Sequence, residues 1–113
     1  MNIDKETSEK IEELQILEQN LQNFFMQKQS IQIELNEVLN ALSEVKKTAD
    51  DIYKVIGGVM IKSNKDQLIK ELEEKKKILD LRIGSIEKQE KIIESKAAGL
   101  KSEITDVVNK KKS

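Results

Sequence analysis

Apolar residues recur at steps of three and four through most of the first half of the chain. From Leu14 the spacing continues to Ile52, and eleven of its twelve positions are apolar. This first seam comprises Leu14, Leu17, Leu21, Phe24, Lys28, Ile31, Leu35, Val38, Leu42, Val45, Ala49 and Ile52. A 3.5-residue repeat kept over more than five heptads indicates a helix that supercoils around a partner. No Gly or Pro interrupts residues 4–51, so the pattern predicts one helix over about residues 5–51.

A second seam of matching length follows residue 63, and ten of its twelve positions are apolar. It comprises Ile69, Leu72, Lys76, Leu79, Ile83, Ile86, Glu90, Ile93, Ala97, Leu100, Ile104 and Val107. Ser63 or Asn64 can cap the start of this helix, with Asp66 and Gln67 respectively three residues later, as in a capping box. The second helix is predicted over about residues 65–110. Two equal seams joined by a short connection predict an antiparallel coiled coil within one chain.

Lys28 and Glu90 are charged residues at seam positions. If Ile52 faces Ile69 beside the connection, Lys28 lies roughly one turn from Glu90. We predict that the two side chains pair across the seam and fix its register at some cost in stability. In the alternative, each long side chain reaches water independently of the other.

The connection, about residues 52–62, is rich in β-branched residues around Gly57-Gly58. Glycines can supply positive φ at both turn positions, so the segment predicts a two-residue β-hairpin. A plain loop is the alternative, and a phosphate-binding loop is disfavoured because the Gly-Lys-Ser/Thr ending is missing. A lone hairpin is marginal in water and exposes two edges, which favours pairing with hairpins of other subunits into a β-barrel. The predicted assembly residues are Tyr53, Val55, Ile56, Gly57, Gly58, Val59, Met60 and Ile61.

Composition narrows the chemistry of this chain. Its 113 residues are 36% charged and 3% aromatic, with a net charge of −1, which favours a long charged helical protein over a thick globular core. Cys and His are absent, which excludes thiolate nucleophiles, imidazole bases and ordinary zinc ligands. We therefore expect no catalytic residue, no metal site, no cofactor and no enzymatic activity. No apolar run approaches the length of a membrane span, and the first six residues lack the apolar core of a signal peptide, so a cytoplasmic protein is expected.

Three segments resemble the prefoldin β subunit family of the archaeal type, and the resemblance covers nearly the whole chain. They are Met26-Gln27-Lys28-Gln29, the hairpin block at residues 49–62, and Ile86-Glu87-Lys88-Gln89-Glu90. The hairpin block is the most specific. The resemblance implies a single prefoldin-like domain over residues 1–113, in a hexamer with prefoldin α subunits (two α, four β) whose hairpins form a β-barrel. It also implies an ATP-independent chaperone that captures unfolded client proteins at the coiled-coil tips and delivers them to a group II chaperonin.

Gly84 and Gly99 depart from what a long helix favours. Each glycine costs about 0.5–1 kcal/mol relative to Ala inside a helix. Both lie off the seam. Tolerated surface positions are therefore favoured over a functional hinge.

Several large apolar residues lie off the two seams, which a solvated coiled coil does not require. They are Ile11, Ile16, Phe25, Met26, Ile33, Leu39, Ile78, Leu81, Ile92 and Val108. Leu39, Ile78 and Leu81 are close enough to the hairpin in sequence to pack against neighbouring subunits. The apolar residues farthest from the hairpin, on and off the seams, are predicted to bind clients: Ile11, Leu14, Ile16, Leu17, Leu100, Ile104, Val107 and Val108. Ordinary seam packing is the alternative for the seam residues of this set.

Two rival functions fit parts of the sequence. A tethering coiled coil explains the heptads but not a β-rich connection near the middle of the chain. A nucleic-acid-binding arm is supported only by Lys110, Lys111 and Lys112, which is little in a chain of nearly zero net charge. Neither nucleic acid nor membrane is therefore expected as a partner.

Overall fold

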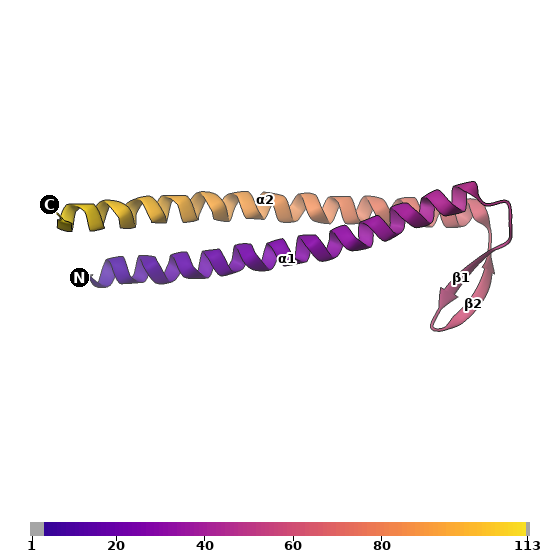
Figure 1. The fold of residues 1–113 in the computed structure, drawn as a ribbon, viewed down its shortest axis with the longest axis horizontal. Coiled ribbons are helices and arrows are strands. Elements are labelled where there is room, and N and C mark those ends of the chain that lie inside the picture. Colours follow the sequence, from indigo (N-terminus) through magenta and orange to yellow (C-terminus); the bar gives the residue numbers. More distant parts are fainter. Residues whose placement is uncertain (1–3, 113) are drawn as a thin grey trace. The chain divides into compact units, whose positions relative to one another are not determined.

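A computed structural model describes residues 4–112 and contains two long helices joined by a β-hairpin. The elements in chain order are α1 (Lys5–Lys47), β1 (Ile52–Ile56), β2 (Val59–Ser63) and α2 (Lys65–Lys112) (Figure 1). The predicted fold class of two helices and a short hairpin is confirmed. The described residues form two compact units. The terminal unit holds residues 4–28 and 85–112, and the hairpin unit holds residues 29–84.

Asp4 caps the start of α1. The backbone N–H of Thr7 donates to Oδ1 of Asp4 at 2.7 Å, which satisfies one of the amides that a helix start leaves without a partner. Glu6 lies in the first turn, and Lys46 and Lys47 lie in the last. These charges have the signs that the helix dipole favours at each end.

α1 ends at Lys47, a few residues before the end predicted from the seam. The Thr48 hydroxyl accepts a hydrogen bond from the backbone N–H of Asp50 at 3.2 Å, a local side-chain contact that competes with helix continuation. The ammonium of Lys65 donates to the carbonyl oxygens of Lys46 (3.3 Å) and Thr48 (3.0 Å). Carbonyl groups at the C-terminal end of a helix have no partner within the helix, and these hydrogen bonds supply one. Ala49, predicted as a seam residue, is therefore exposed outside the helix.

Asn64 is the residue that caps α2. Its side-chain oxygen accepts hydrogen bonds from the backbone N–H groups of Asp66 (2.9 Å) and Gln67 (3.2 Å). Ser63, the other candidate cap, is the last residue of β2. Asn64 is thus the single residue between β2 and α2, and its side chain caps the helix.

The connection is a two-residue β-hairpin, as predicted. Gly57 and Gly58 have φ values of 55° and 80°, and Ile56 pairs with Val59 on either side of them. Positive φ at both central residues gives a turn whose twist matches the two strands. The pairing continues in antiparallel register to Ile52 and Ser63.

The seams form the contact between α1 and α2 within each unit. Every seam residue except Ala49 is buried or half-buried. The buried apolar side chains of the hairpin unit are Ile31, Leu35, Val38, Leu42 and Leu79. Among the apolar side chains described in the terminal unit, only Ile86 and Ala97 are buried to that degree. The seam is therefore packed more completely in the hairpin unit.

Lys28 and Glu90 meet across the seam of the terminal unit. Nζ of Lys28 lies 2.8 Å from Oε1 of Glu90, and the two side chains are 29% and 12% exposed. The hydrogen bond to Glu90 raises the pKa of Lys28 above 10.5, against partial desolvation and with help from the charges of Glu90, Glu87 and Glu94. The predicted pair is confirmed. Its contribution to stability is present below pH 10.5 and is lost as the pH rises through the raised pKa.

Replacing both members of this pair tests whether it fixes register at a cost. In the double variant Lys28→Leu/Glu90→Leu, apolar packing replaces two partly desolvated charges, so we expect a higher unfolding temperature. The single variant Lys28→Leu should unfold at a lower temperature, because Glu90 stays mostly buried without its cation. Thermal unfolding followed by circular dichroism measures both. A double variant less stable than the parent would mean that the pair stabilises the fold outright.

Gly84 and Gly99 can be tested in the same assay. A Cβ atom built at either position meets no atom within 4 Å, so alanine fits without strain. We expect Gly84→Ala and Gly99→Ala each to raise the free energy of unfolding by about 0.5–1 kcal/mol, measured by urea titration. A loss of stability in either variant would argue against the tolerated-surface interpretation.

Candidate functional surfaces

The hairpin presents apolar side chains on both of its faces. Its register places Tyr53, Val55, Met60 and Lys62 on one face, and the remaining strand residues on the other. Val55 is 70% exposed and Met60 is 67% exposed. All eight residues predicted for assembly are exposed: Tyr53, Val55, Ile56, Gly57, Gly58, Val59, Met60 and Ile61.

The hairpin also has two open edges. The sheet contains β1 and β2 only, so the described residues supply no third strand. In an antiparallel pair, every second residue turns its N–H and C=O away from the neighbouring strand. Open edges of this kind, flanked by exposed apolar side chains, favour pairing with another strand.

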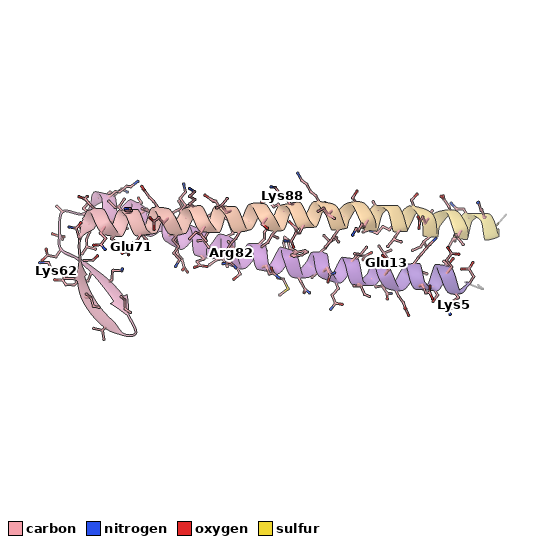
Figure 2. All side chains as sticks on the ribbon, turned by 180° about the vertical axis from the view of Figure 1, so that it is seen from behind. Lys5, Glu13, Lys62, Glu71, Arg82 and Lys88 are labelled. Atoms are coloured by element: carbon pink, nitrogen blue, oxygen red, sulfur yellow. The ribbon has the colours of Figure 1, made fainter. Side chains whose placement is uncertain are left out.

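One ion pair holds the base of the hairpin to α2. Nζ of Lys54 lies 2.6 Å from Oε2 of Glu71, and Glu71 lies at the hairpin end of α2 (Figure 2). Ile52, half-buried at the start of β1, lines a groove of about 590 Å³ together with Val45, Leu68 and other residues of the hairpin unit. The base of the hairpin is thus fixed to the helices, whereas its distal part is exposed.

The residues predicted to bind clients gather at the chain-end part of the terminal unit. Of the eight, Ile16 alone is exposed, at 59%. The other seven are half-buried: Ile11, Leu14, Leu17, Leu100, Ile104, Val107 and Val108. Ile11 and Val108 are half-buried although they lie off the seam. Each lies next in sequence to a half-buried seam residue, Lys10 and Val107 respectively, and the Glu18–Lys101 ion pair (3.9 Å) joins the two helices nearby.

The first seam extends one heptad further towards the N-terminus than its apolar pattern indicates. Thr7 is buried and Lys10 is half-buried, at the two positions that the 3.5-residue repeat assigns to the seam before Leu14. Lys10 pairs with Glu103 of α2 at 3.3 Å, and that hydrogen bond raises its pKa. These contacts were missed because polar residues carry no hydrophobic signal. Continuing the 3.5-residue repeat from Leu14 towards the N-terminus identifies both positions.

Most of the remaining off-seam apolar residues are exposed. They are Phe25, Met26, Ile33 and Leu39 on α1, and Ile78, Leu81 and Ile92 on α2. Over residues 4–112, no helix is both long enough and apolar enough to cross a membrane. The same residues contain no group of three or more side chains arranged to hold a metal ion.

The comparisons with known proteins agree with this architecture. A profile for prefoldin subunits matches residues 8–111. The chain therefore belongs to the prefoldin family of chaperone subunits. Within that family its relatives are β subunits, as the resemblance indicated. It is 35% identical to prefoldin subunit beta of Thermococcus kodakarensis, over 91% of this chain and 90% of the relative.

Two further matches cover almost the whole chain. Prefoldin subunit beta of Methanospirillum hungatei is 32% identical over 98% of this chain and 94% of the relative. The crystal structure of the prefoldin beta subunit from Thermococcus strain KS-1 is similar with a TM-score of 0.88 and 32% identity, covering 94% of this chain and 95% of that one. The likeness therefore includes both helices and the hairpin.

Proposed function

We propose that this chain is a β-type subunit of an ATP-independent holding chaperone of the cytoplasm. In this proposal it assembles with prefoldin α subunits through its hairpin and captures unfolded proteins at its coiled-coil tips. The observation that carries the proposal is the exposed, two-edged apolar hairpin on a chain of the prefoldin family. A rod that only tethered two partners would not need such an element.

Assembly follows from the open edges of the hairpin. Hairpins of two α and four β subunits pair edge to edge until the sheet closes into a barrel, which removes every edge. The exposed side chains around Val55 and Met60 gain burial in the process. The Lys54–Glu71 ion pair sets the direction in which the hairpin leaves the helices.

Capture uses the looser packing of the tips. Ile16 is already exposed, and the half-buried Leu14, Leu17, Leu100 and Ile104 become accessible when the helix ends separate. Such aliphatic side chains bury apolar segments of an unfolded client without requiring a defined sequence.

Several tips acting together explain how a client is held without nucleotide. Each contact is weak, and multivalent binding supplies the overall affinity. A client then transfers to a group II chaperonin as tips are displaced one at a time. No bound cofactor is required for either step.

Charging the hairpin tests assembly. In Val55→Lys/Met60→Lys, two like charges replace an apolar cross-strand pair on the exposed face, so we expect the hexamer to dissociate in analytical ultracentrifugation with the prefoldin α subunit. The matched control is Lys62→Gln on the same face, which should assemble normally. Helix content by circular dichroism should be unchanged in both. Hexamers of the double variant at micromolar concentration would contradict hairpin-mediated assembly.

Trimming the tips tests capture. We expect deletion of residues 1–13 and 100–113 to abolish protection of a denatured client while leaving the hexamer intact. Light scattering of the client, diluted from denaturant into buffer with the complex, measures protection. Suppression by the untrimmed complex alone supports tip-mediated holding. Suppression by neither complex, despite a hexameric mass, would indicate a multi-armed scaffold that tethers fixed partners.

A further inference from the structure

A stretch of α1 in the terminal unit carries no charge. Residues 19–27 contain no Lys, Arg, Asp or Glu, although 36% of the chain is charged. The charges that border this stretch both pair with α2: Glu18 with Lys101 at 3.9 Å, and Lys28 with Glu90 at 2.8 Å. The outer surface of this part of α1 is therefore locally neutral.

Two large apolar side chains are exposed on this neutral surface. Phe25 is 47% exposed and Met26 is 58% exposed. Helical side chains lean towards the preceding turn, so Met26 lies over Gln22 and Asn23. We define the amide face as Phe25 and Met26 together with the exposed amide residues Gln19, Asn20, Gln22, Asn23 and Gln27. Within residues 4–112, no side-chain hydrogen bond engages these five amides.

We propose that the amide face is a second client-contact surface, which takes an extended apolar segment of unfolded polypeptide whatever its net charge. This inference rests on the proposed function and adds a site outside the tips. Phe25 and Met26 supply apolar area, and the unbranched thioether of Met adapts to differently shaped segments. The Gln and Asn side chains both donate and accept hydrogen bonds, as the backbone of an extended peptide requires.

The lack of charge determines the kind of occupant. Covering a Lys or Glu with an apolar segment removes its hydration without supplying a counter-charge, which is costly. The amide face avoids this cost for acidic and basic clients alike. A folded partner, in contrast, is selected and oriented by complementary charges around an apolar centre. The amide face offers no such charges, so unfolded polypeptide is the occupant that it fits.

Ile92 provides a matched control in the same unit. It is exposed to the same extent as Met26, 58%, but lies on α2. Its side chain leans over Lys88, which lies on the side of α2 facing away from α1 (Figure 2), and Lys91 and Glu94 flank it in sequence. If exposure alone attracts clients, the two positions should behave alike. If neutrality matters, only Met26 should contribute.

The test compares Phe25→Ser/Met26→Ser with Ile92→Ser in the complete complex with the prefoldin α subunit. The probes are two reduced, denatured proteins of opposite net charge, lysozyme (basic) and α-lactalbumin (acidic). For both probes we expect Phe25→Ser/Met26→Ser to require roughly threefold more complex for half-maximal suppression of light scattering, because apolar area is lost from the contact. Ile92→Ser should match the parent. A photo-crosslinking residue placed at position 26 should capture both probes, and one at position 92 neither.

Each outcome separates this inference from the proposed function. Suppression that is unchanged in Phe25→Ser/Met26→Ser would contradict client binding at the amide face. An equal reduction in Ile92→Ser would contradict it as well. Neither result would contradict capture at the tips. Crosslinking of only one probe at position 26 overturns the claim of charge independence. If the parent complex suppresses neither probe, holding activity itself fails, and the amide face fails with it.

Discussion

The structure depends on the burial of two apolar seams that neither helix can bury alone. A single helix of 43 or 48 residues would leave a stripe of aliphatic side chains in water along its whole length. Pairing the helices antiparallel removes that exposure and makes the seam the source of most of their stability. Cross-helix ion pairs such as Lys46–Glu73 and Glu34–Lys75 then line its margins. At exposed positions they contribute little energy, but their matched signs favour one register.

The apolar side chains of the hairpin, unlike those of the seams, are not buried within the chain. Its side chains are exposed on both faces and its edges are open, so little within one chain stabilises it beyond the turn and its base. Gly57 and Gly58 fix the turn, and the Lys54–Glu71 pair fixes the base. Such an element is maintained at a cost to the isolated subunit. Covering by further strands would offset this cost.

Periodicity predicted most of the fold because burial along a seam depends on spacing more than on detail. It predicted both helices and the meeting of Lys28 with Glu90, and the two adjacent glycines predicted the turn at Gly57-Gly58. It missed the early end of α1, where the Thr48 hydroxyl and the Lys65 ammonium decide the outcome through single hydrogen bonds. It also missed Thr7 and Lys10, whose burial depends on the partner helix. For the candidate site, spacing identified the exposed apolar positions. It could not indicate which tip residues are half-buried, since that depends on the fit between two particular surfaces.

The shared register of the two helices restricts how such a protein can change length during evolution. Within the terminal unit, the pairs Lys28–Glu90 and Glu18–Lys101 show this opposition, because moving towards the N-terminus on α1 is matched by moving towards the C-terminus on α2. Inserting a single residue into one helix would misalign every facing pair between the insertion and the chain end. Only whole heptads added to both helices together keep each apolar residue against its counterpart. Longer or shorter arms are therefore expected to arise by paired insertions or deletions, whereas the hairpin can keep its length.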